Sequence, residues 1–165
     1  MKKITLIFGS VIGLVLTTNS IIHMSMMYSN PNYKGNDVIG YATMVIIFSV
    51  IYFGVRNYRN KRLDGKMGFP KAFKTGALIC FIASSYYVVF GLLYYYLFVP
   101  DFMDVYAEYI IRNSPGSEVE AKTAQMASFK EMSKNPLFLV LFSYFEVLPI
   151  GMIVALISAF IVKRK

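Results

Sequence analysis

The stretch LFLVLFSYFEVLPIGMIVALISAFIV, residues 137–162, is apolar along almost its whole length and carries a single acid, Glu146. A helix needs roughly 17–25 mainly apolar residues to cross about 30 Å of hydrocarbon, so this stretch is long enough to span a membrane. Only helices and closed barrels satisfy their own backbone in lipid, and the stretch lacks the alternation of barrel strands. It therefore predicts a transmembrane helix with a carboxyl group inside it.

Three further segments have the same character, namely residues 4–28, 38–55 and 77–99. The first follows Lys2 and Lys3, as in a signal peptide, but no small-residue cleavage site follows its apolar run, so we expect a retained helix. Hydrophobic residues make up 56% of the chain and charged residues 16%, against about 25% charged in soluble domains. The sequence therefore predicts an all-α membrane protein, a single four-span domain over residues 1–165.

The basic residues are unevenly distributed between the two sides of these spans, which predicts the orientation. Both termini and the loop 56–76 hold most of the 17 Lys and Arg residues, so we expect them in the cytoplasm. This basic set consists of Lys2, Lys3, Arg56, Arg59, Lys61, Arg62, Lys66, Lys71, Lys74, Lys163, Arg164 and Lys165.

The net charge of +8 is explained by this orientation and by contact with lipid. A basic residue near an anionic membrane surface contributes about 1 kcal/mol. Because the chain has no basic motif interleaved with aromatic residues, we expect the lipid bilayer, and not nucleic acid, as the partner of this charge. The residues predicted to contact headgroups are Arg56, Arg59, Lys61, Arg62, Lys71 and Lys74.

The segment 100–136 between the third and fourth spans is the sizeable non-apolar part. Two helices are expected in it, at 101–113 and 118–134, separated by the string SPGS. Ser117 and Glu120 have the spacing of a capping box at the start of the second helix. The segment is therefore predicted to be an extracytoplasmic helical hairpin. Its weak apolar stripe favours packing on the bundle or along headgroups, with partner docking as the alternative.

Small residues indicate where helices approach closely, because close backbone contact drives helix association in lipid. Gly9 and Gly13 form a G-x-x-x-G pattern in the first span, and Gly151, Ala155 and Ala159 form a stripe in the fourth. Both patterns fit a tight bundle and self-association equally well. Six tyrosines near the outer ends of the spans are interpreted as an interfacial belt, namely Tyr28, Tyr33, Tyr41, Tyr94, Tyr95 and Tyr96.

Glu146 is the residue that most needs an explanation, since an acid inside a membrane is costly and marks a candidate functional site. At 1.5 Å rise per residue, Asn19 lies at a similar depth, with Tyr87 near the same level and His23 one turn beyond Asn19. We therefore predict an intramembrane polar cluster of these four residues. Pro149 removes one helical hydrogen bond and predicts a kink next to it.

Two interpretations of Glu146 stay open. In the first, a neutral carboxyl donates a hydrogen bond and fixes the register of the helices. In the second, Glu146 handles protons or cations. A single histidine and a single cysteine, Cys80, predict no metal site and no disulfide, and the chain has no catalytic motif. We therefore expect no cofactor, and an enzyme is the least expected class.

Several short strings along the chain are distinctive together: Asn30-Pro31, Gly40-Tyr41, Asn57-Tyr58-Arg59, Lys71-Ala72-Phe73-Lys74, Pro100-Asp101-Phe102-Met103 and Glu146 with Pro149. Through these motifs the chain resembles a family of short bacterial membrane proteins, the one catalogued as domain of unknown function 4199 and typical of the Bacteroidetes group. The resemblance covers nearly the whole chain and implies a four-span protein of the bacterial inner membrane, with no known activity. Pro70 departs from the family pattern, where glycine is expected.

Three functions remain as hypotheses. The first is a non-catalytic accessory, assembly or regulatory membrane protein with a membrane-protein partner or a second copy of itself. The second is an oligomeric proton or small-solute pathway that uses Glu146. The third and weakest is a membrane enzyme of unrecognised type.

Overall fold

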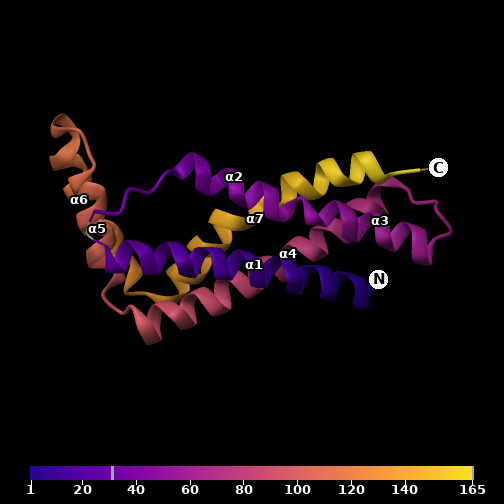
Figure 1. Cartoon of the computed structure of the whole chain (residues 1–165), viewed down its shortest axis with the longest axis horizontal. Coiled ribbons are helices and arrows are strands. Elements are labelled where there is room, and N and C mark those ends of the chain that lie inside the picture. Colours follow the sequence, from indigo (N-terminus) through magenta and orange to yellow (C-terminus); the bar gives the residue numbers. More distant parts are fainter. Residues whose placement is uncertain (31, 165) are drawn as a thin grey trace.

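The structure is a computed structural model that describes residues 1–30 and 32–164. Pro31, from one of the family motifs, and Lys165, from the C-terminal basic set, lie outside the described residues. Helices account for nearly all of the described chain (Figure 1). They are α1 (Lys2–Ser29), α2 (Asp37–Phe48), α3 (Val50–Arg62), α4 (Phe69–Phe98), α5 (Phe102–Arg112), the 3₁₀ turn η1 (Gly116–Glu118), α6 (Val119–Ser133) and α7 (Pro136–Val162).

Four of these helical segments are long and apolar enough to cross a membrane: α1, α2 together with α3, α4 and α7. The prediction of an all-helical chain with four such segments is therefore confirmed. Helices α2 and α3 are divided only at Ser49, whose backbone stays in the right-handed helical region at φ −57° and ψ −21°. They form one span from Asp37 to Arg62.

The helices extend beyond the apolar runs at the basic segment, which corrects the predicted loop 56–76. Helix α3 continues to Arg62 and α4 begins at Phe69, so the connection between them is only residues 63–68. A helix does not have to end where its apolar run ends, because its backbone hydrogen bonds are internal and form in water as well as in lipid. Pro70 occupies the first turn of α4, where its missing N–H costs no helical hydrogen bond.

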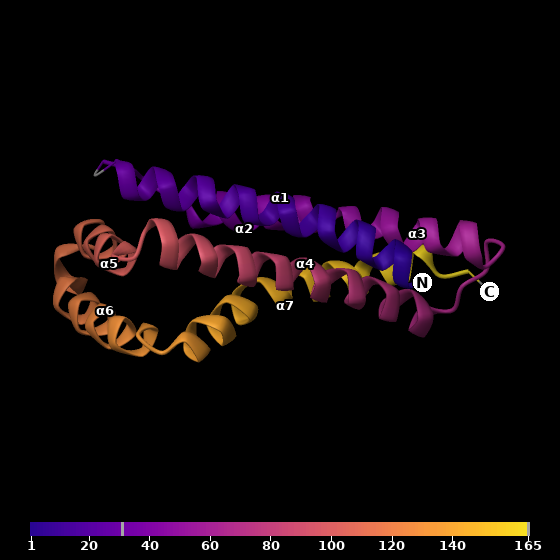
Figure 2. The same ribbon diagram turned by 90° about the horizontal axis from the view of Figure 1, so that it is seen from below.

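Helix α4 lies between α1 and α7 and packs against both (Figure 2). Small residues occupy these contacts: a Cβ at Gly9 would lie 2.7 Å from Ile82 Cβ, and one at Gly13 would meet Tyr86 and the Ala83 carbonyl. Ala155 packs against Gly76 of α4. The remaining stripe residues of α7, Gly151 and Ala159, are buried within the same chain. The small stripes therefore face neighbouring helices of one molecule.

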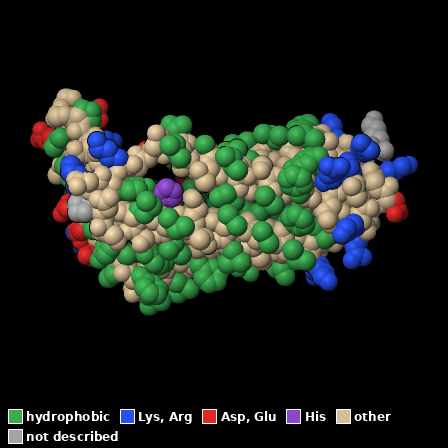
Figure 3. All heavy atoms as spheres, in the orientation of Figure 1, with side chains coloured by type: hydrophobic (Ala, Val, Ile, Leu, Met, Phe, Trp, Pro, Cys, Tyr) green, Lys and Arg blue, Asp and Glu red, His purple; other side chains and the backbone are tan. Residues whose placement is uncertain are grey.

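Charged side chains gather at the two ends of the bundle (Figure 3). Lys and Arg cluster where α3 ends and where the described termini lie, and we call this the basic end. Asp and Glu cluster at the opposite end, around α5 and α6, which we call the hairpin end. The sides between them are covered with apolar side chains such as Ile46, Phe81 and Ile161. This arrangement suits a helical bundle whose long sides face lipid.

Arg59 does not behave as the predicted headgroup contact, because it is buried at 7% exposure. Its Nη1 donates a hydrogen bond of 2.8 Å to the carbonyl of Val162, and its Nε donates one of 2.9 Å to Asn60. Val162 is the last residue of α7, whose final carbonyls lack helical partners. Arg59 therefore caps α7. The other predicted headgroup residues are exposed at the basic end: Arg56, Lys61, Arg62, Lys71 and Lys74.

The chain between α4 and α7 forms the expected pair of helices, α5 and α6, which contact each other. The predicted capping box of Ser117 and Glu120 is not formed. Ser117 lies inside η1, whose Glu118 N–H bonds the Pro115 carbonyl at 2.8 Å, and α6 starts without a side-chain cap. From α6, Phe129 packs edge-on against Phe142 of α7 with ring centres 5.0 Å apart. The hairpin is therefore fastened to the bundle by its apolar side.

Candidate functional site

Two cavities lie towards the hairpin end of the bundle, and Glu146 lines both. The first, of about 260 Å³, is lined mainly by apolar and aromatic side chains, and we call it the apolar cavity. The second, of about 340 Å³, is richer in polar groups, and we call it the polar cavity. The residues that line both are Ser20, Tyr87, Tyr106 and Glu146. The carboxyl group therefore stands where the two cavities meet.

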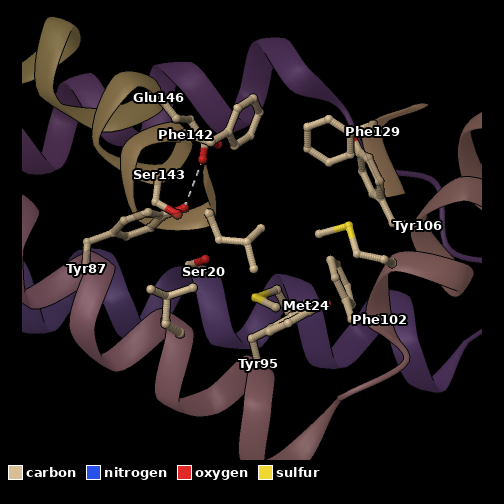
Figure 4. A pocket seen from close by; sticks show the side chains of 14 residues that line it. Ser20, Met24, Tyr87, Tyr95, Phe102, Tyr106, Phe129, Phe142, Ser143 and Glu146 are labelled. Carbon is tan, nitrogen blue, oxygen red and sulfur yellow. Dashed lines mark hydrogen bonds between the residues drawn. The ribbon is translucent and has the colours of Figure 1, made fainter. Parts of the chain in front are cut away.

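Tyr87 of α4 is the hydrogen-bond partner of Glu146. Its hydroxyl donates to Glu146 Oε2 at 3.3 Å (Figure 4). Helix α7 continues past Glu146 and past Pro149 to Val162 and changes direction along its length (Figure 2). Because a proline removes one helical hydrogen bond, Pro149 supplies a physical reason for such a bend.

Asn19 and His23 line the polar cavity with Glu146 and Tyr87, so the structure brings the four residues of the predicted polar cluster to one place. They are not joined in one hydrogen-bonded chain. His23 Nδ1 shares a hydrogen bond of 2.7 Å with the hydroxyl of Tyr33, in the connection between α1 and α2. The histidine is thus hydrogen-bonded to the α1–α2 connection and not to the carboxyl group of Glu146.

Much of the lining comes from the hairpin and was missed by the sequence analysis. Phe102, Met103 and Tyr106 of α5 and Phe129 of α6 line the apolar cavity, opposite Met24 of α1 (Figure 4). Tyr33, Tyr41 and Tyr95, assigned from sequence to an interfacial belt, also line the cavities. The pattern Phe102, Tyr106 and Tyr109 on adjoining turns of one helix was the signal available in the sequence.

Tyr106 presents a neutral phenol to both cavities. Burial, above all, raises the pKa of Tyr106 above its ordinary value, and the carboxyls of Asp37 and Glu146 raise it further. The ring is therefore an uncharged aromatic surface with a hydroxyl at physiological pH. Such a ring can pack against apolar groups and can also attract a cation through its face.

Polar contacts fasten the hairpin over the cavities. Tyr28 donates to Asp101 at 2.7 Å, and the backbone N–H of Gly35 donates to the hydroxyl of Tyr109 at 2.9 Å. Lys130 of α6 pairs with Asp104 of α5, and this hydrogen bond is the main cause that raises the pKa of Lys130. The hairpin is thus tied to α1, to the α1–α2 connection and across its own two helices.

We expect Tyr109→Phe to weaken the contact between the hairpin and the α1–α2 connection without unfolding the bundle. The change removes the acceptor of the Gly35 N–H, a hydrogen bond worth about 0.5–1.5 kcal/mol, and keeps the ring. Hydrogen–deuterium exchange should accelerate in residues 33–36 and in α5, while α4 and α7 stay unchanged. Tyr96→Phe, at an exposed tyrosine, is the matched control. Equal exchange in both variants would contradict the assigned role.

The interior of the bundle towards the basic end is closely packed. Phe48, Ile51, Val55, Ile79, Cys80 and Val147 are fully buried there. Val147 directly follows Glu146, so tight apolar packing begins one residue beyond the carboxyl. A cavity of about 480 Å³ at this end is a hollow on the outer surface between α1 and α3, lined by residues that are exposed or half-buried: Lys3, Ile4, Ile7, Phe8, Asn57, Lys61 and Arg62. Within residues 1–30 and 32–164, no three His, Cys, Asp or Glu side chains come together in a way that could hold a metal ion. The geometry therefore offers two adjoining cavities towards the hairpin end, with a carboxyl group where they meet.

Four helices able to span a membrane, small-residue helix contacts and a cavity at one end define a multi-pass helical protein. The family model described as Protein of unknown function (DUF4199) matches residues 7–164, nearly the whole chain. The protein therefore belongs to this family, which confirms the resemblance drawn from its motifs. Comparisons with curated proteins and with solved structures found no match.

Proposed function

We propose that this protein is a non-catalytic membrane protein that acts by binding, as an accessory or regulatory component of a membrane assembly. The observation that carries the proposal is the contrast between the two halves of the bundle. Cavities with a carboxyl group lie beneath the hairpin, whereas close packing fills the interior of the other half, whose cavity is a hollow on its outer surface. Such a shape suits the holding of a ligand or partner group better than the passage of a solute.

The proposal includes a location and an orientation. We place the chain in the inner membrane of a bacterium, with both termini and the basic end in the cytoplasm and the hairpin on the outer side. The clustering of Lys and Arg at one end supports this, because basic residues are retained on the cytoplasmic side. Arg56, Lys61, Arg62, Lys71 and Lys74, exposed at that end, would meet anionic headgroups.

The orientation predicts a labelling pattern for single cysteines in a Cys80→Ala background. Ser117→Cys places a thiol in the hairpin. Gly68→Cys places one in the short α3–α4 connection, where an added Cβ meets only Pro70, at 3.9 Å. A membrane-impermeant maleimide should label Ser117→Cys in intact cells with the outer membrane permeabilised. It should label Gly68→Cys only after the inner membrane is opened, and the reverse pattern would refute the orientation.

The alternative function, a proton or small-solute pathway through Glu146, makes a different prediction in reconstituted vesicles. We expect proton and cation flux in proteoliposomes to equal that of protein-free vesicles, for the wild type and for Glu146→Gln alike. The packed apolar half of the bundle supplies the physical reason. Flux above background that disappears with Glu146→Gln would overturn the binding role and establish the pathway.

The accessory role is tested by co-purification. The chain is tagged at its C-terminus, extracted from native membranes in mild detergent and analysed by quantitative mass spectrometry. We expect a second protein at near-stoichiometric amount, in contact with the hairpin or the basic end. Recovery of the chain alone, or only with copies of itself, would count against an accessory role.

A further inference from the structure

The charges around the two cavities favour a cation. Among the described residues that line them are two carboxylates, Glu146 and Asp37, and no lysine or arginine. The one histidine, His23, is engaged with Tyr33. A phosphate or carboxylate ligand would find no positive side chain there and would be repelled by Glu146. An ammonium group would find a carboxylate and several aromatic faces.

The shape and lining favour a ligand with an apolar part. From Glu146 the apolar cavity extends between α1, α4, α7 and the hairpin, past Met24, Phe102, Phe129 and Phe142 (Figure 4). Its size is close to the lower end of ligand pockets, about 300–1,000 Å³. Apolar lining with one charged group at the end is typical of sites that hold amphipathic molecules by burial and orient them by one polar contact. A bare metal ion would leave this apolar surface unused.

Glu146 itself has room for a further partner. Among residues 1–30 and 32–164, its carboxylate has one side-chain hydrogen bond, the rather long one of 3.3 Å from Tyr87. A carboxylate accepts several hydrogen bonds, and an acid at membrane depth is stable only when paired, hydrated or neutral. The lining hydroxyls of Ser20 and Tyr106 could accept from or orient the remaining hydrogens of an ammonium group.

We propose that the two cavities bind an amphipathic ligand with an ammonium head, the head on Glu146 and the apolar part along Met24, Phe102, Phe129 and Phe142. The inference rests on the binding role proposed above and names its ligand class. Two sources share this chemistry, a free amphipathic amine and the ammonium headgroup of an ethanolamine lipid. The experiment separates them.

The test uses the full chain in nanodiscs of phosphatidylglycerol, a lipid whose headgroup carries no ammonium. Binding of radiolabelled octylamine, an ammonium ion at pH 7, is compared with that of neutral octanol and anionic octanoate, and binding to protein-free discs is subtracted. We expect saturable octylamine binding at least ~10-fold tighter than that of octanol, and no saturable octanoate binding, because charge-assisted hydrogen bonds exceed neutral ones in strength. A second measurement in discs containing phosphatidylethanolamine identifies the source of the ammonium group. If this lipid weakens octylamine binding by competition, the natural ligand is the lipid. If octylamine binding is unchanged, the natural ligand is a free amine.

Three variants decide the assignment. Glu146→Gln should remove the preference for octylamine over octanol, whereas Glu131→Gln, which removes an exposed acid from α6, should retain it. Gly91→Leu enlarges a residue that lines the apolar cavity, and a Cβ there meets no atom within 4 Å, so it should weaken binding with the fold intact. This variant keeps the test decisive if Glu146→Gln fails to fold.

Octylamine binding that is not saturable, that matches octanol, or that survives both Glu146→Gln and Gly91→Leu would overturn the inference. These outcomes leave the proposed function standing, because that function fails on separate results: Glu146-dependent flux in proteoliposomes, or recovery of the chain without a second protein. If Glu146→Gln loses the preference for octylamine, and if flux does not exceed that of protein-free vesicles, both the ligand class and the proposed binding function are supported.

Discussion

Gly13→Ala is expected to destabilise the bundle by about 2 kcal/mol, although it adds a single methyl group. A Cβ at this position would lie 2.5 Å from Cβ of Tyr86 and 2.9 Å from the carbonyl oxygen of Ala83. Both atoms belong to or adjoin the α4 backbone, so neither can move aside by a rotamer change. Helix α1 must instead shift away from α4, and overpacking of this kind costs about 1–3 kcal/mol.

Thermal denaturation in detergent, followed by size-exclusion chromatography of the folded fraction, measures this effect. For a chain of this length the midpoint should fall by about 4–8 °C. Gly40→Ala is the matched control, because a Cβ on this α2 glycine meets no atom within 4 Å. It should be neutral or stabilising by up to ~1 kcal/mol, through helix propensity. Equal midpoints for the two variants would show that α1 and α4 do not approach as closely as described.

Arg59→Met is expected to cost about 1.5–3 kcal/mol and to loosen the end of α7. The guanidinium is buried and donates to the Val162 carbonyl, the last of that helix. Methionine fills much of the volume but leaves this carbonyl without its charged donor, and a hydrogen bond to a charged group is worth about that much. A positive charge at a helix C-terminus adds a favourable interaction with the helix dipole, which is lost as well.

The control is Arg62→Met, three residues further along α3, at an exposed arginine. It should leave the free energy of unfolding within about 0.5 kcal/mol of the wild type, and so hardly change the melting midpoint. Hydrogen exchange should rise at residues 159–164 in Arg59→Met alone. Arg59→Lys should restore part of the stability, since lysine keeps the charge and loses the planar geometry of the guanidinium. If Arg59→Met and Arg62→Met melt alike, Arg59 is not the cap of α7.

The two interpretations of Glu146 drawn from the sequence are each supported by a different structural observation. The hydrogen bond from Tyr87 fits a role in fixing the register of α4 against α7. The position of the carboxyl at the meeting of two cavities fits a role towards a ligand. The variants Tyr87→Phe and Glu146→Gln separate them: a purely structural pair would lose similar stability in each, and a ligand site would lose its amine preference only in Glu146→Gln.

The four spans and the intramembrane acid could be determined from the sequence alone. A run such as residues 137–162 is long, apolar and local, and in lipid its backbone has only the helix available, so no knowledge of its neighbours is needed. The small residues Gly9, Gly13 and Gly151 were equally visible as contact points. The sequence does not show which helix each of these glycines contacts. Packing within one chain and self-association produce the same stripe of small residues.

Only the tertiary structure shows which residues of the chain contact one another. Arg59 was assigned to lipid because its local sequence is a basic segment, and only the approach of α7 from 103 residues away buried it against Val162. The cavities likewise depend on where α5 lies over the bundle, which brings Phe102 and Tyr106 to Glu146. Such contacts follow from the rotation and crossing of whole helices. These are set by the summed packing of many side chains, and no local pattern of residues encodes them.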